Sequence, residues 1–261
     1  MQTYDEQAAF YNTHWPAMKA AAEAGGGQAV VDFILGFEDE LERRVLFMFA
    51  RQGLAMDDWQ GKSFDALIEV ADAGIAELVR QAEGTEDAQT RDKRIDAANV
   101  ISFNLGADLA DCWPGDNEPR EARHFQRGVQ AGQDCLRWRE ALNKPAGPLS
   151  MAWWVKGIHE FSLGEAQNAI DSFQRSLDFA KKDAAEAGLA KDVSSAGTFP
   201  VVLGSGYLGL ARWRSGVEDG QAQYLAAIAV FGEQAQDDKT KDDALFGIAQ
   251  LEAVRSKYIK P

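Results

Sequence analysis

The stretch that decides the fold is residues 151–177, MAWWVKGIHEFSLGEAQNAIDSFQRSL. Apolar residues recur every three or four positions on both sides of Gly164, which predicts two amphipathic helices joined by a short turn. We expect Gly164 to end the first helix, because glycine adopts the left-handed conformation at little cost. The small residues Gly157 and Ala169 indicate where the two helices come closest, since a larger side chain would push the backbones apart.

The same pattern recurs along the chain at a nearly constant distance. Gly106, Gly157 and Gly209 are separated by 51 and 52 residues, and each lies inside an apolar helical pattern. The last two are followed seven positions later by Gly164 and Gly216. Self-similarity at such a period is typical of stacked helix pairs.

Residues 151–177 resemble a tetratricopeptide repeat, in which aromatic, small and turn residues follow one another in a set order. The residues that carry this resemblance are Trp153, Gly157, Phe161, Gly164, Ala169 and Phe173. The resemblance covers roughly residues 95–237. The family's period is about 34 residues, so the longer period here implies longer helices or insertions. Lys156 and Glu160 stand where the family has apolar residues.

Helical patterning extends over almost the whole chain, and alternation with period 2 is nearly absent, which predicts the all-α class. We expect about ten helices, forming an α-solenoid of stacked antiparallel hairpins of the tetratricopeptide type. Residues 1–92 are predicted to form N-terminal hairpins packed on the repeats, and residues 93–261 the repeats with a C-terminal capping helix. The expected helices span residues 2–24, 28–52, 61–83, 87–112, 118–142, 149–163, 165–188, 200–215, 218–236 and 240–258.

The composition narrows the classes of partner. The 261 residues include 41 acidic and 27 basic side chains, for a net charge of −14, which repels nucleic acid and anionic lipid and favours solubility or a cationic partner. Residues 29–50 are apolar but interrupted by charges, so they cannot span a bilayer. Cys112 and Cys135 are too few for a disulfide framework and lack metal-ligand spacing. With no secretion signal at the N-terminus, we expect a cytoplasmic protein.

The resemblance implies a binding surface, because the first helices of such repeats line the concave face. The residues that this assigns to a partner-binding site are Phe103, Asn104, Trp154, Ile158, Phe161, Tyr207, Leu210 and Trp213. Closely spaced aromatic rings offer large contact area at low entropic cost. The alternative is that these rings only pack the core, since a helical stripe is what packing itself requires. The carboxylate clamp of some family members is not carried over, because Val155 and Tyr207 replace its polar residues.

Signals for catalysis or metal binding are weak. Glu121 and His124 have the spacing found in di-iron bundles, but those sites need a second copy and further carboxylates. His159 and Glu160 lack the second histidine of a zinc helix. The run from Trp113 to Asp116 is expected to form a tight turn. We therefore expect no catalytic residues, metal or cofactor.

Taken together, the sequence favours a non-enzymatic adaptor or scaffold that holds a protein or peptide segment on its concave face. The alternative is a small-molecule-binding or sensing module in which the helices enclose an apolar pocket. An α-helical enzyme is a third class, without a residue set to support it. Self-association through the ends of the solenoid is left open.

Overall fold

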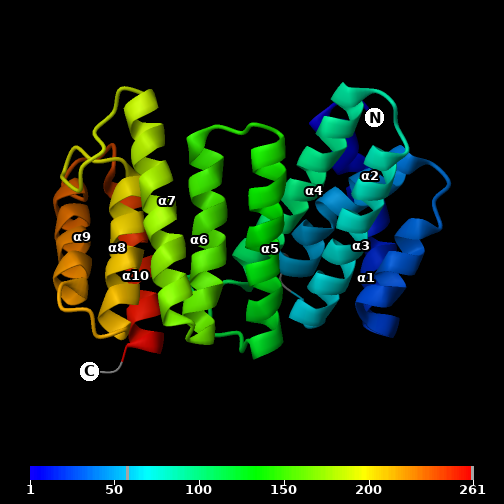
Figure 1. Ribbon diagram of the computed structural model, residues 1–261. Coiled ribbons are helices and arrows are strands. Elements are labelled where there is room, and N and C mark those ends of the chain that lie inside the picture. Colours follow the sequence, from blue (N-terminus) through cyan, green and yellow to red (C-terminus); the bar gives the residue numbers. More distant parts are fainter. Residues whose placement is uncertain (57–58, 260–261) are drawn as a thin grey trace. The chain divides into compact units, whose positions relative to one another are not determined.

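The computed structural model describes residues 1–56 and 59–259 (Figure 1). Within these residues the protein consists of ten α-helices and one π-helical turn, and no strand is formed beyond an isolated bridge between Ala190 and Gly197. The all-α class is therefore confirmed. The chain divides into two compact units, unit 1 (Met1–Leu109) and unit 2 (Ala110–Pro261). The division predicted after residue 92 lies inside a helix of unit 1, and residues 260–261 of the predicted second region lie outside the described residues.

Unit 1 contains the first four helices. They are α1 (Tyr4–Leu35), α2 (Glu40–Arg51), the π-helical turn η1 (Gln52–Met56), α3 (Phe64–Glu83) and α4 (Ala88–Leu109). Helix α3 packs against α1, α2 and α4. It carries a buried carboxylate, Glu77, which receives hydrogen bonds from Arg43, Arg80 and Gln81. Those contacts, the Arg80 hydrogen bond foremost, lower the pKa of Glu77 to about 2.

The predicted helix 28–52 is wrong, because the chain breaks it in two. Gly25 and Gly26 have non-helical backbone angles, so α1 is kinked there, but the helix continues to Leu35. The Asp39 side chain then accepts a hydrogen bond of 2.7 Å from the backbone nitrogen of Leu41 and caps α2. Aspartate is favoured at this position because its carboxylate satisfies an unpaired backbone N–H group.

Unit 2 contains the last six helices. They are α5 (Ala122–Ala141), α6 (Ala146–Leu163), α7 (Ala166–Glu186), α8 (Phe199–Arg214), α9 (Gly220–Gln234) and α10 (Lys241–Tyr258). Each helix from α5 to α9 packs on the next, and α10 packs on both α8 and α9. Figure 1 shows this order from green α5 to orange α9, with α10 in red. Neighbouring helices thus pack consecutively in space.

Glycines lie at the crossings of two hairpins, as the sequence predicts. A Cβ atom on Gly157 of α6 would lie 2.8 Å from the Phe173 ring of α7. A Cβ atom on Gly209 of α8 would lie 2.5 Å from the backbone nitrogen of Tyr224 on α9. Gly164 ends α6 with φ +81°, in the left-handed region. The small residues therefore permit close approach of α6 to α7 and of α8 to α9.

The two charged residues that interrupt the repeat pattern belong to the first of these hairpins. Lys156 Nζ and the buried Glu160 carboxylate form an ion pair on α6. The Ser172 hydroxyl of α7 donates to Glu160 over 2.6 Å and accepts from Lys156 over 3.0 Å. Because every member of this network has a partner, the polar atoms join the helices instead of separating them.

Candidate functional site

Four of the eight predicted binding residues lie in the core of unit 2. Ile158, Phe161, Tyr207 and Leu210 are each at most 1% exposed. Their assignment to an open concave face is therefore corrected, and the structure places them among the packing residues. The Tyr207 ring stacks on Phe173 with a centroid separation of 5.2 Å. In this conformation, side chains buried to this degree are covered by the chain itself.

The other four predicted residues are not brought together into one site. Trp154 of α6 and Trp213 of α8 are partly buried against the core of unit 2. Trp213 packs against Tyr224, with ring centroids 5.7 Å apart. Phe103 and Asn104 lie on α4 and belong to unit 1.

A segment of the chain itself explains why the rings of α6 and α8 are covered. Helix α4 ends at Leu109, not at residue 112 as predicted. Residues 110–121 contact side chains of α6, α8 and α10 in unit 2. We name the covered surface the α6–α8–α10 face; its residues are Trp154, Tyr207, Phe246, Gln250 and Tyr258. The 110–121 segment inserts Cys112 and Trp113 into this face.

Trp113 and Cys112 make the apolar contacts of the 110–121 segment. The Trp113 ring meets Trp154 edge to face at 6.0 Å and stacks on Phe246 at 6.3 Å, measured between ring centroids. Cys112 is fully buried, and its sulfur accepts a hydrogen bond of 3.4 Å from Gln250 Nε2. Burial raises the pKa of the Cys112 thiol to about 12. The thiol is therefore neutral at physiological pH.

The 110–121 segment turns back immediately after Trp113. The backbone nitrogen of Asp116 donates to the carbonyl of Trp113 over 3.2 Å, and Gly115 has φ +79°. Proline at the second position and glycine with positive φ at the third are typical of a type II turn. The tight turn predicted for residues 113–116 is confirmed.

Ionic contacts tie the 110–121 segment to α10 and to itself. Asp111 pairs with Lys257 and accepts a hydrogen bond of 2.9 Å from the Tyr258 hydroxyl. Arg120, whose side chain is 1% exposed, pairs with Asp116 at 2.5 Å and with Asp111 at 3.6 Å. Burial alone would raise the pKa of Asp116, but the hydrogen bond from Arg120 lowers it. The acidic side chains of the segment, Asp111 and Asp116, are thus held by the basic side chains of Lys257 and Arg120.

Three polar atoms where the segment meets the face have no hydrogen-bond partner among the described residues. They are Trp154 Nε1, Tyr207 Oη and Gln250 Oε1, and each is buried. Cys112 and Trp154 both lie beside the Tyr207 hydroxyl. Burial, together with Cys112, raises the pKa of Tyr207 well above its ordinary value, although Trp154 acts in the opposite direction. An unsatisfied buried polar group costs about 1–3 kcal/mol. The 110–121 segment therefore fills the face but leaves these three atoms without a partner.

Sequence reasoning did not single out Gln250 or Phe246. On α10 the buried positions include Gly247, Gln250, Leu251 and Val254, which recur at helical spacing. A glutamine on such a stripe is the signal that could have identified the polar centre, because buried polar side chains require partners. No comparable signal marks Phe246, whose contact with Trp113 joins residues far apart in the sequence.

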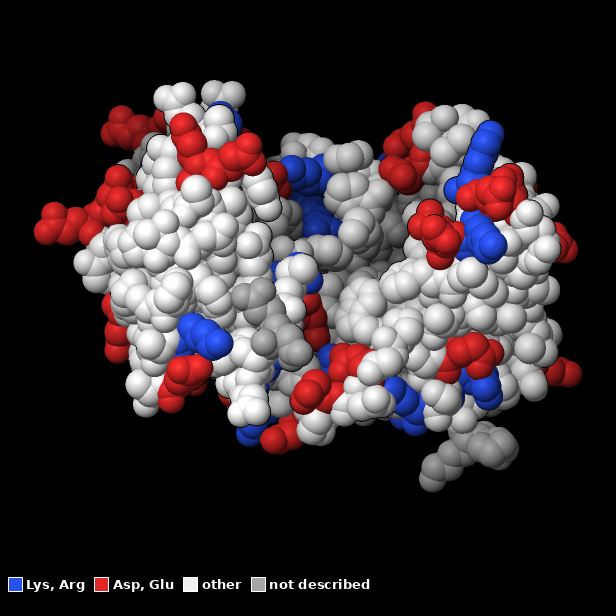
Figure 2. All heavy atoms as spheres, turned by 180° about the vertical axis from the view of Figure 1, so that it is seen from behind, with Lys and Arg blue, Asp and Glu red and all other residues white. Residues whose placement is uncertain are grey.

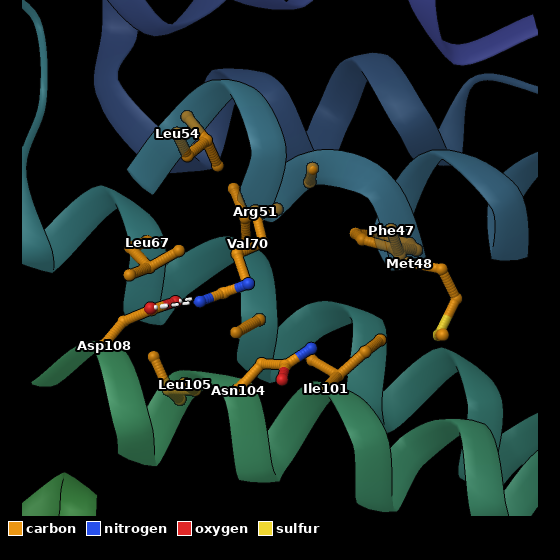
Figure 3. A pocket seen from close by; sticks show the side chains of 12 residues that line it. Phe47, Met48, Arg51, Leu54, Leu67, Val70, Ile101, Asn104, Leu105 and Asp108 are labelled. Atoms are coloured by element: carbon orange, nitrogen blue, oxygen red, sulfur yellow. Dashed lines mark hydrogen bonds and ion pairs between the residues drawn. The ribbon is translucent and has the colours of Figure 1, made fainter. Parts of the chain in front are cut away.

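A pocket lies within unit 1, between α2, α3 and α4 (Figure 3). Its apolar lining includes Phe47, Leu67 and Ile101, and Arg51 and Asp108 form an ion pair of 2.5 Å beside it. The predicted residue Asn104 also lines it. The cavity volume is about 20 Å³, enough for about one water molecule. Small-molecule sites are typically about 300 Å³ or larger, so this pocket gives the sensing alternative no support, and that alternative stays a prediction.

The residues weighed for metal binding have structural roles. His124 is buried, and its Nδ1 accepts a hydrogen bond of 3.1 Å from the backbone nitrogen of Glu121 at the start of α5. His159 is fully buried and packs against Gly128 of α5. Among residues 1–56 and 59–259, no group of three or more histidine, cysteine or acidic side chains could hold a metal ion.

None of the helices in the described part of the chain combines the length and apolar character needed to cross a membrane. Comparisons of the chain with protein-family models, with curated proteins and with solved structures gave no match.

Proposed function

We propose that unit 2 is a tetratricopeptide-like binding scaffold, without catalytic activity of its own, that holds a segment of a partner protein on the α6–α8–α10 face. Helices α6 and α8 begin successive hairpins, and α10 packs on the second of them as a capping helix. In this proposal they correspond to the first helices of consecutive repeats. A cytoplasmic location belongs to the same proposal, supported by the acidic composition and the low cysteine content.

The observation that carries the proposal is the 110–121 segment itself. It engages the α6–α8–α10 face through a partly buried ring, a backbone turn and ion pairs, which are the contacts by which folded domains recognise peptides. The face therefore has the chemistry to hold a non-helical segment. Three of its buried polar atoms also receive no hydrogen bond from the segment now in place. A partner that supplied hydrogen bonds to them would gain binding energy.

Part of this surface is accessible beside the 110–121 segment. Phe246 of the face is 43% exposed, and its neighbour in the sequence, Leu245, is 48% exposed. Figure 2 views the protein from behind relative to Figure 1 and shows the visible surface of unit 2 as largely uncharged at its centre, with charged side chains nearer its edges. Depletion of charged side chains at the centre is typical of a protein interface.

The proposal is tested by selecting peptides from a displayed random library on the immobilised full chain. We expect selected peptides to bind at micromolar affinity and to lose at least about tenfold in affinity with Phe246→Ala, the loss of one anchoring contact. Leu225→Ala is the matched control, because Leu225 is also an exposed apolar residue but lies on α9. Peptides that bind equally well to both variants and to the parent chain would refute the assignment of this face.

A further inference from the structure

The 110–121 segment matches the α6–α8–α10 face at its two ends but not at its centre. At one end Trp113 lies between Trp154 and Phe246, and at the other Asp111 pairs with Lys257. Between them Cys112 presents a thiol, which is only a weak hydrogen-bond acceptor. A segment with strong contacts at both ends and a weak one between them is not the best ligand for this face.

The centre of the face has buried hydrogen-bond donors, and Cys112 does not accept hydrogen bonds from them. The Trp154 indole N–H is a donor only, and the Tyr207 hydroxyl is also able to donate. Both atoms are buried and lack a hydrogen-bond partner among the described residues. A hydroxyl oxygen has two lone pairs and so accepts from two donors. Serine has nearly the shape of cysteine, so a hydroxyl fits where the thiol of Cys112 now lies.

We propose that residues 110–121 are a displaceable internal occupant, and that the α6–α8–α10 face binds a partner segment with three consecutive residues: an acidic one, one with a hydroxyl side chain, and tryptophan. This inference rests on the proposed function and names its ligand class and its regulation. The acidic residue takes the place of Asp111 beside Lys257, and the tryptophan takes the place of Trp113. Binding releases the internal segment, which makes the free protein self-inhibited.

One basic side chain, Lys257 of α10, lies where the partner segment would bind, although the whole protein is acidic. The net charge of −14 favours a cationic partner. The charged contact at this place is instead basic, because Lys257 of α10 already pairs with Asp111 of the segment. Opposite charges placed at an interface mainly determine orientation and specificity. The partner segment is therefore acidic where it meets α10.

The test uses labelled ten-residue peptides of the sequence 109–118, LADCWPGDNE, and the full-length chain. One peptide has the parent sequence, a second carries Cys112→Ser and a third carries Trp113→Ala. Binding is measured by fluorescence anisotropy to the parent chain and to a chain with Trp113→Ala, which weakens the internal occupant. We expect the Cys112→Ser peptide to bind the Trp113→Ala chain at least about tenfold tighter than it binds the parent chain. The Cys112→Ser peptide should also bind the Trp113→Ala chain about tenfold tighter than the parent peptide binds it, because tenfold is the change in affinity for one added hydrogen bond.

The matched control is a chain with Trp153→Ala. Trp153 is also on α6 but packs with Lys156 and Arg175. This chain should bind the peptides no better than the parent chain does, and the Trp113→Ala peptide should bind no chain. Equal affinity of the two tryptophan-containing peptides for the Trp113→Ala chain would overturn the assigned hydroxyl. Equal affinity for the parent and Trp113→Ala chains would overturn self-inhibition.

A second variant covers the case in which Trp113→Ala unfolds the chain, as judged by circular dichroism. Arg120→Ala removes the pairs to Asp111 and Asp116 and leaves every side chain of the face intact. It should raise peptide affinity in the same direction. If both variants unfold, the segment is an integral part of the fold and the inference is overturned. If library-selected peptides bind the face of a folded variant but the segment peptides do not, the proposed function stands and only this inference fails.

Discussion

Replacing Tyr207 by phenylalanine is expected to stabilise the protein, although the residue is fully buried. The Tyr207 ring packs on Phe173 and Trp154, and phenylalanine preserves both contacts. What Tyr207→Phe removes is a hydroxyl that has no hydrogen-bond partner among the described residues. Leaving such a group buried costs about 1–3 kcal/mol. The void left by one oxygen atom costs about 0.3 kcal/mol by the usual dependence on cavity volume.

The expected net gain for Tyr207→Phe is therefore about 0.7–2.7 kcal/mol. For a domain of this size, that corresponds to a rise in Tm of about 1–11 °C. Differential scanning calorimetry and urea unfolding measure both quantities. The matched control is Tyr224→Phe on the neighbouring helix, because the Tyr224 hydroxyl donates to Glu252. That change should instead lower stability by about 1–2 kcal/mol.

The two tyrosine variants show whether the Tyr207 hydroxyl is unsatisfied or hydrogen-bonded in solution. If Tyr207→Phe destabilises the protein as much as Tyr224→Phe does, the Tyr207 hydroxyl is hydrogen-bonded in solution, by a buried water or by a different orientation of the Gln250 amide. The unsatisfied centre of the α6–α8–α10 face would then be refuted, and with it the argument for a hydroxyl-bearing ligand. A rise in Tm with Tyr207→Phe and a fall with Tyr224→Phe is the pattern that the structure predicts.

Three further outcomes are expected. Gly209→Ala should destabilise the protein by about 1–3 kcal/mol in urea unfolding, because the added Cβ would lie 2.5 Å from a backbone nitrogen of α9. The control Gly232→Ala, whose Cβ would have nothing within 4 Å, should stabilise the protein by up to about 1 kcal/mol. Similar free energies of unfolding for the two variants would contradict a close helix crossing at Gly209. The Glu77 pKa is lowered from 4.5 to about 2 in the folded state, chiefly by Arg80, so the contribution of Glu77 to stability is complete above pH 4.5 and is lost as the pH falls toward 2. Glu77→Gln should therefore reduce the pH dependence of the free energy of unfolding, measured in urea across this range. An unchanged pH profile would show that the Glu77–Arg80 pair is not formed. Cys112 has a pKa of about 12 in the folded protein, so at pH 8 it should react with iodoacetamide at least about a hundredfold more slowly there than in the urea-unfolded protein. Mass spectrometry measures both rates. Comparable rates would mean that the thiol is accessible in the folded protein.

The sequence by itself determined the local structure of this protein. The apolar spacing on both sides of Gly164 is enough to predict the α6–α7 hairpin and its crossing at Gly157, because helix periodicity and the need for small residues at a close approach are short-range effects. The turn at Trp113 to Asp116 was equally predictable from proline and glycine. The break before α2 was missed, since a single aspartate cap in a polar run is a weak local signal.

Only the tertiary structure decided which rings are core and what covers them. The periodicity that marks Tyr207 and Phe161 as lying on one side of their helices is the same for a groove and for a packed interior. What distinguishes the two is the path of residues 110–121, which brings Cys112 to within 3.4 Å of Gln250, 138 residues away. Such a contact depends on how six helices stack, and no local pattern records it. The candidate site therefore follows from long-range packing, whereas the helices that build it follow from the sequence.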